Sequence, residues 1–154
     1  MGKTPVVRHR LSRDHLSAIG LLSLSPRRER VGAHLRLLDS AARSEDFVHC
    51  LRHILRLFRG PVIVLWDRLS AHRSKAVQAL LAKHPRLSIE LLPPYAPELN
   101  PVDHLWSLMK RGDGANHSAQ DMAELEETVH RRYAQMKRDQ LKGCLRGTKC
   151  NWLR

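Results

Sequence analysis

The sequence predicts an α/β domain with a mixed sheet flanked by helices, and three observations support this fold class. Apolar and polar residues alternate over much of the first forty positions, as they do in antiparallel strands. An apolar run, Val62–Trp66, follows Gly60-Pro61 and leads into Asp67, as a central strand would. Helical spacing follows this run and a second short strand comes after it. This order indicates a parallel strand pair joined by a crossover helix.

The first forty residues predict an antiparallel meander of two or three strands. The candidate strands are Val6-Val7, Leu16–Leu24 and Val31–Leu38. Two turn signals separate them, Ser12-Arg13-Asp14 and Ser25-Pro26-Arg27-Arg28. We expect the strands to pair with their neighbours along the chain, because the connections are short.

A helix is predicted from Ser44, as its N-cap, to about Arg59, where Gly60-Pro61 ends the helical spacing. One side of this helix carries apolar residues at helical intervals. The other side carries a basic stripe of four residues: His49, Arg52, His53 and Arg56. Such a stripe fits either a DNA backbone or, more often, a face in contact with solvent.

The segment from Val62 to Asp67 is predicted to be a strand buried on both faces that ends on an acid. A helix over residues 72–84 and a strand over Ser88–Leu92 follow it. In open α/β sheets, ligands bind beyond the carboxyl ends of the strands. A carboxylate at position 67 is therefore placed where a functional site is expected.

The next helix is predicted to begin after a stiff loop, Pro93–Pro97. Asn100 is a suitable N-cap and Pro101 a suitable first helical residue, which puts Asp103 in the first turn. An acid at this position also stabilises the helix dipole, so by itself it does not indicate a site.

After a break at Gly112–Gly114, Ser118 and Asp121 resemble a capping box for a long amphipathic helix that runs through Met136. The last thirty residues are basic. A chain of 154 residues has room for one compact domain and one appended element. We therefore divide it into residues 1–113 as the main domain and residues 114–154 as a helical, basic C-terminal segment.

The charge of the chain favours a polyanionic partner. Lys and Arg number 27 against 15 Asp and Glu, a formal net charge of +12. A genome whose codon usage favours arginine would give the same excess of basic residues. The three cysteines form no CxxC pair, so neither a disulfide framework nor a zinc site is indicated. The sequence contains no apolar run of membrane length and no secretory signal, which predicts a cytoplasmic, nucleoid-associated protein with no membrane role.

Three ordered motifs resemble one protein family. Trp66-Asp67 is followed by His72, then by the run Leu92-Pro93-Pro94-Tyr95-Ala96-Pro97-Glu98-Leu99-Asn100-Pro101-Val102-Asp103-His104-Leu105-Trp106, then by Lys110-Arg111. Together they resemble the second half of the mariner-type DDE transposases, in particular their bacterial insertion-sequence branch. The resemblance extends from residue 1 to about residue 140.

The resemblance implies a ribonuclease-H-like fold that cuts and joins DNA strands with Mg²⁺ or Mn²⁺ at a two-metal site. Asp67 would be the second catalytic and metal-binding acid, and Asp103 the third. Glu98 is a rival for the third role, but it matches the wrong position of the motif. The basic residues beside the motifs, His72, Arg73, Lys110 and Arg111, would bind DNA. The expected partner is double-stranded DNA, both element ends and target, and a homodimer is possible in the family.

The sequence departs from the family at the first acid, which ends the first strand of the family's domain. The only acids before Glu45 are Asp14, Glu29 and Asp39, and none ends an apolar strand. We expect a missing first strand in an N-terminally truncated domain, from a truncated or split frame or a start codon assigned too late. The chain alone should then have little strand-transfer activity. The alternatives are a non-catalytic DNA-binding remnant or dimerising inhibitor of an intact transposase, and a basic adaptor unrelated to transposition.

Overall fold

A computed structural model describes residues 16–110, 121–150 and 152 of the chain, without the side chains of residues 70 and 72. The described elements, in chain order, are β1 (Ser17–Leu24), β2 (Val31–Leu38), α1 (Ser44–Leu57), β3 (Val62–Trp66), the 3₁₀ turn η1 (Ser70–Arg73), α2 (Lys75–Lys83), β4 (Leu87–Leu91), the 3₁₀ turn η2 (Pro97–Leu99), α3 (Pro101–Lys110), α4 (Met122–Ala134) and α5 (Arg138–Arg146).

β1 and β2 form an antiparallel hairpin, as the sequence predicted. Their register runs from Ser17 opposite Leu38 to Leu24 opposite Val31. The connecting turn is closed by a backbone hydrogen bond of 2.7 Å from the Arg28 N–H to the Ser25 carbonyl, and Arg28 has a left-handed φ of 57°. The other strand and turn predicted in this region, at Val6-Val7 and residues 12–14, lie outside the described residues.

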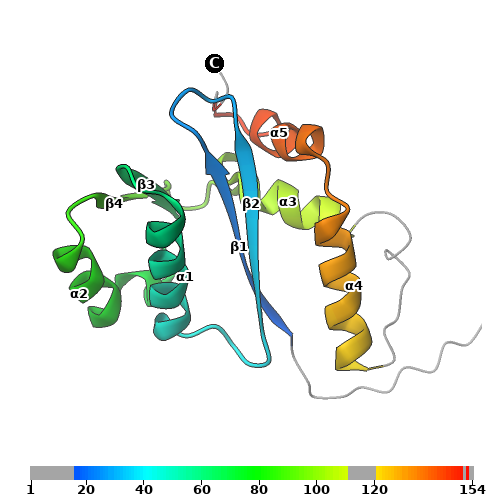
Figure 1. Cartoon of the computed structure of the whole chain (residues 1–154), viewed down its shortest axis with the longest axis horizontal. Helices are drawn as coiled ribbons and strands as arrows, with labels where there is room; N and C mark the ends of the chain where they lie inside the picture. Colours follow the sequence, from blue (N-terminus) through cyan, green and yellow to red (C-terminus); the bar gives the residue numbers. More distant parts are fainter. Residues whose placement is uncertain (1–15, 111–120, 151, 153–154) are drawn as a thin grey trace, which may run out of the picture.

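Helices lie on both faces of the hairpin (Figure 1). On one face, β2 contacts α5 and β1 contacts α3. Gly20 is required there, because a Cβ at this residue would lie 2.5 Å from the Trp106 ring of α3. The buried residues of this core, which we call the hairpin core, are Val31, Leu105, Leu141, Cys144 and Leu145.

α1 lies between the hairpin and the second sheet (Figure 1). Its buried side chains contact β3, β4 and α2 in a second core, which we call the α1 core: Val48, Leu51, Leu55, Val64, Val77, Leu80 and Leu87. The predicted N-cap of this helix was wrong by one residue. The N-cap is Arg43, whose N–H donates to the Asp46 carboxylate at 2.9 Å, and Ser44 is the first helical residue. The helix ends at Leu57 rather than at Arg59.

β3 and β4 form a parallel pair joined by α2, which confirms the predicted crossover. The prediction that β3 is buried on both faces was wrong. Ile63 and Leu65 are 67% and 45% exposed, because within the described residues the helices pack against the opposite face only. The crossover helix also starts later than predicted, since Ser74 caps it by accepting from the Val77 N–H at 3.4 Å.

The four described strands form two separate sheets of two strands each. Both kinds of pairing occur, one antiparallel and one parallel, but the single mixed sheet predicted from the sequence is not formed among the described strands. The two pairs are not hydrogen-bonded to each other within the part of the chain that the structure describes.

The C-terminal segment contains two helices where the sequence predicted one long helix. α4 ends at Ala134, and α5 begins at Arg138 after a short turn. Asp121 is itself the N-cap of α4, with its carboxylate accepting from the Glu124 N–H at 2.8 Å, whereas the predicted partner Ser118 lies outside the described residues. None of the described helices has the length and apolar character needed to cross a bilayer.

Candidate active site

Asp67 lies immediately after the carboxyl end of β3 and is exposed. Its carboxylate accepts a hydrogen bond of 3.1 Å from the Leu69 N–H, which orients the side chain at the start of the loop. Because β3 and β4 are parallel, their carboxyl ends lie on the same edge of the sheet. The acid is therefore at the edge where ligands bind in α/β sheets.

The loop that leads toward Asp103 starts beside this edge. The Leu92 N–H donates to the Trp66 carbonyl at 2.7 Å, and the Arg68 guanidinium donates to the Leu92 carbonyl at 3.2 Å. The proline-rich segment then turns at Tyr95, which has a φ of 55° and is 99% exposed. The start of the loop, at Leu92, is thus attached to the residues next to Asp67.

Asp103 is exposed in the first turn of α3. The predicted cap is confirmed, because the Asn100 side-chain oxygen accepts from the Val102 N–H at 3.1 Å. The side chain is therefore open to a ligand from solvent.

α3 is held by the hairpin core, and this packing fixes the position of Asp103. Leu105 and Met109 are 1% and 8% exposed, and Trp106 packs on Gly20. Glu98, the rival acid, lies in η2 and pairs with Lys149 at 3.8 Å. Its carboxylate thus contacts the C-terminal segment.

The predicted DNA-binding residues lie in two places. Arg73 is exposed in η1, shortly after Asp67, and Lys110 is exposed at the end of α3. His72 is in η1, but its side chain is not described, and Arg111 lies outside the described residues. Within residues 16–110, 121–150 and 152, no three His, Cys, Asp or Glu side chains gather in a way that could hold a metal ion. A shared cation at Asp67 and Asp103 therefore stays a prediction.

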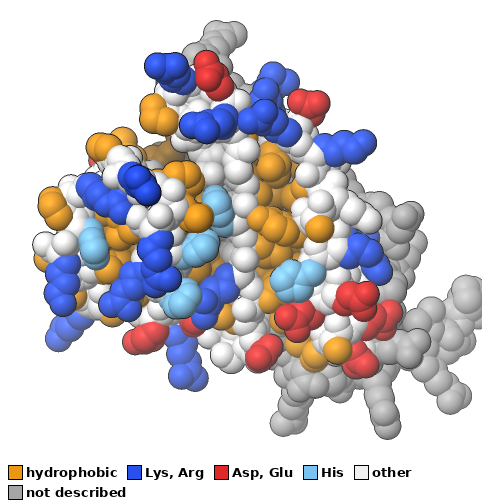
Figure 2. All heavy atoms as spheres, viewed as in Figure 1, with side chains coloured by type: hydrophobic (Ala, Val, Ile, Leu, Met, Phe, Trp, Pro, Cys, Tyr) orange, Lys and Arg blue, Asp and Glu red, His pale blue; other side chains and the backbone are white. Residues whose placement is uncertain are grey.

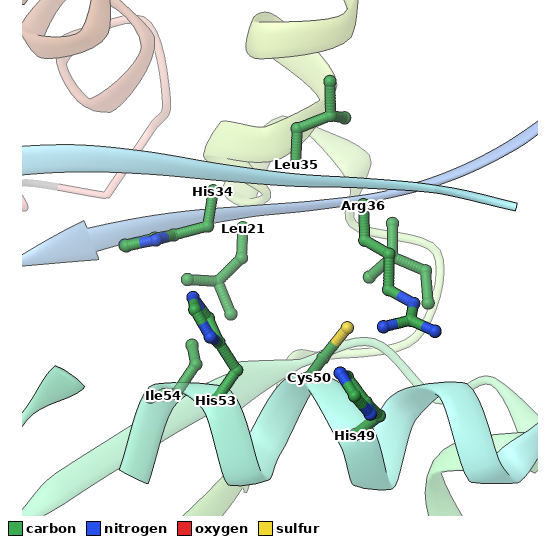
Figure 3. Close-up of a pocket in the computed structure, with 9 residues that line it drawn as sticks. Leu21, His34, Leu35, Arg36, His49, Cys50, His53 and Ile54 are labelled. Carbon is green, nitrogen blue, oxygen red and sulfur yellow. The ribbon is translucent and has the colours of Figure 1, made fainter. Parts of the chain in front are cut away.

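A pocket of about 200 Å³ between α1 and the hairpin was not anticipated (Figure 3). Its floor is apolar, and its walls include His34 of β2 and His53 of α1, whose rings pack edge to face with centroids 6.3 Å apart. Burial, and secondarily the proximity of His53, lowers the pKa of His34. Strand alternation places His34 and Arg36 on one face, but their contact with α1 is set by packing, which the sequence did not reveal.

Comparison with known proteins identifies the family. The DDE superfamily endonucleases match residues 1–126, so the chain belongs to this family. Its fold is similar to that of the Mos1 mariner transposase. Compared with the structure of the Mos1 paired end complex with Mn, this chain has a TM-score of 0.67 at 17% sequence identity. The match covers 98% of this chain and 46% of the Mos1 chain. This chain therefore spans less than half of that Mos1 chain.

Two structures of the Mos1 catalytic domain show the same similarity. For the domain alone, the TM-score is 0.58 at 14% identity, over 88% of this chain and 83% of that one. For the catalytic domain with raltegravir and Mg, the TM-score is 0.55 at 16% identity, and the match covers 88% of this chain and 84% of the Mos1 chain. At these identities the likeness concerns the fold. No curated protein matches the sequence significantly. The family prediction is thus confirmed, while the bacterial insertion-sequence branch stays a prediction.

Proposed function

We propose that this chain is the catalytic part of a mariner-like transposase from an insertion sequence, and that it cuts and joins DNA strands. Family membership and the transposase-like fold support the class of activity. The observation that carries the proposal is the position of Asp67, exposed at the carboxyl edge of β3 and β4, where the loop toward Asp103 begins. An acid of the motif at the edge where α/β sheets bind ligands supports a site there, and the loop that leads to the other acid starts beside it at Leu92.

We propose that Asp67 and Asp103 bind the divalent cations, Mg²⁺ or Mn²⁺. The residues fit such ions, because hard cations prefer oxygen ligands and both carboxylates are exposed. Mos1 structures contain Mn or Mg. When bound in pairs, such ions activate the attacking oxygen and stabilise the leaving oxygen of a phosphodiester. The protein's own contribution is to hold the acids, Asp67 through the Leu69 amide and Asp103 through the cap of α3.

The proposed substrate is double-stranded DNA, both the element ends and the target. Arg73 and Lys110, together with His72 and Arg111, would contact its phosphates. The net charge of +12 and the paired end complex formed by Mos1 support this partner. We further propose that the protein acts on the nucleoid in the cytoplasm and can form a homodimer.

We also propose that a further strand, which is not one of the four described, completes the sheet and supplies the first acid. Two observations support this: the described strands form two separate sheets, and no group of three metal-binding side chains gathers among the described residues. Two carboxylates alone hold a pair of cations poorly. Without that strand, the protein should have little or no strand-transfer activity.

The metal site is tested by thermal unfolding with and without Mn²⁺. We expect Mn²⁺ to raise the melting temperature of the wild type, because a ligand that binds only the folded state adds about 2.7 kcal/mol at one hundred times its Kd. The shift should disappear in Asp67→Asn and Asp103→Asn. It should persist in Glu98→Gln, the rival acid, and in Asp139→Asn, an exposed acid in the first turn of α5. Equal shifts in all variants would contradict the proposed site.

DNA cleavage assays separate the proposal from its alternative, a non-catalytic DNA-binding remnant or dimerising inhibitor. The alternative is supported by the same observation, that no three metal-binding side chains lie together among the described residues. It predicts DNA binding without any Mn²⁺ shift in the wild type. Efficient cleavage of element ends by the purified chain, lost in Asp67→Ala, would refute the expected inactivity and confirm the catalytic role of this acid.

A further inference from the structure

The face of α1 opposite its buried side chains carries four exposed residues that form a single line along the helix: His49, Arg52, His53 and Arg56. We call this set the α1 stripe. Residues three and four apart in a helix lie on one side, so the four side chains follow one another along the axis. Over the seven residue steps from His49 to Arg56 the line is about 10 Å long, which corresponds to about three nucleotide steps of one DNA strand.

The arginines of the α1 stripe differ from other arginines nearby. Arg36 pairs with Asp46 at 3.7 Å, and Arg86 donates to the carbonyls at the end of α1, including that of Gly60 at 2.9 Å. Among the described residues, neither Arg52 nor Arg56 has an ion pair or a side-chain hydrogen bond. Their charges are therefore not used within the described fold.

The charge of the molecule is also segregated. Figure 2 shows Lys and Arg side chains gathered over α1 and α2, whereas acidic side chains gather over α4. The acids of α4 include Glu124, Glu126 and Glu127. A polyanion that approaches this side of the molecule is therefore attracted to α1 and repelled from α4.

α1 also contacts the strand that precedes the proposed cleavage site. Phe47, near its start, packs edge to face on Trp66 with ring centroids 5.9 Å apart, and Trp66 precedes Asp67. With about 3.6 residues per turn, His49 is about half a turn from Phe47, so the α1 stripe lies on the side of the helix opposite the contact with Trp66. Figure 3 shows His49 and His53 on the side of α1 that faces β2, so the two imidazoles border the groove between helix and hairpin.

We propose that the α1 stripe binds the phosphate backbone of the DNA substrate. Permanently charged guanidinium groups at Arg52 and Arg56 pair with phosphate oxygens, and the imidazoles border the same track. This inference rests on the proposed function and adds to it a surface distinct from the residues of the family motifs. The binding is independent of base sequence, because only the backbone is contacted.

The test is the salt dependence of binding to a random-sequence duplex, measured on the full chain by fluorescence anisotropy. The slope of log K against log salt should fall by about 1.8 in the double variant Arg52→Gln/Arg56→Gln, since each phosphate contact contributes about 0.9. The matched control, Arg27→Gln/Arg30→Gln, removes the same charge from two exposed residues of the β1–β2 turn and should leave the slope unchanged. Circular dichroism verifies that both variants are folded.

A local measurement complements the slope. A photo-crosslinking amino acid in place of His53 should form a covalent adduct with the duplex, whereas the same group in place of Glu126 on α4 should not. Equal loss of slope in both double variants, or no loss in the α1 variant, would overturn the inference and leave the proposed function intact. A wild type that shows no salt-dependent binding would overturn both.

Discussion

The two acids of the candidate site are held by two different cores. Asp67 follows β3, and Val64 of this strand belongs to the α1 core. Asp103 lies in the first turn of α3, and Leu105 of this helix belongs to the hairpin core. The proline-rich loop is the covalent link between them. A site built in this way depends on both cores, so a packing defect in either one should disturb it.

The cores also differ in how completely they are covered. The hairpin has helices on both faces, whereas β3 and β4 are covered on one face within the described residues, with Ile63 and Leu65 exposed on the other. Asp103 is therefore held by a more enclosed unit than Asp67.

The largest effect is expected from Leu105→Ala, because this side chain is 1% exposed in the hairpin core. Large-to-small substitutions at such positions cost about 2–5 kcal/mol of unfolding free energy. Leu65→Ala, at a position 45% exposed, should cost less than about 1 kcal/mol. Urea unfolding of both variants measures the contrast, and similar losses would show that the β3–β4 face is covered as well as the hairpin.

Gly20→Ala tests the contact between the hairpin and α3. The added Cβ would lie 2.5 Å from the Trp106 ring, so the helix that carries Asp103 must shift, at a cost of about 1–3 kcal/mol. Gly60→Ala is the control, because no atom lies within 4 Å of a Cβ built there. Thermal unfolding of the pair should show a lower melting temperature in the first variant only. A stable Gly20→Ala protein would mean that α3 is not packed as described.

Asn100→Ala should lower stability by about 1 kcal/mol, because it removes the acceptor for the Val102 N–H at the start of α3. Asn100→Asp keeps a good cap and should be nearly neutral. Chemical denaturation of the two variants measures the difference. If both lose the same amount, the cap does not determine where this helix begins.

The smallest expected effect is the dependence of stability on pH through His34. Burial lowers its pKa in the folded state from the ordinary value of 6.5, so the unfolded chain binds the proton more readily. The contribution of His34 to the free energy of unfolding is fully present above pH 6.5 and decreases as the pH falls through that value. Urea unfolding between pH 5 and 8 should show a shallower decline in His34→Leu. An unchanged decline would exclude His34 as its source.

Local patterns predicted most of the elements. Alternation identified β1 and β2, the apolar run identified β3, and the Asn100-Pro101 pair located the start of α3, as the hydrogen bond to Val102 confirms. The errors fall where tertiary contacts decide. The exposed face of β3 could not be foreseen, because an apolar run looks the same whether one face is covered or two.

The candidate site was found through its motifs, and its geometry was not predictable from them. The sequence located Asp67 and Asp103 at the ends of elements that the structure confirms. Their assignment to separate cores and the pocket between His34 and α1 depend on how distant elements pack. No local pattern encodes these contacts.

The central claim, that Asp67 and Asp103 share a divalent cation, is tested most directly by the anomalous scattering of Mn²⁺ in crystals of the protein. The account predicts an anomalous peak about 2.1 Å from carboxylate oxygens of both residues. Mn²⁺ bound to only one of these acids, or the two side chains on opposite sides of the molecule, would contradict it.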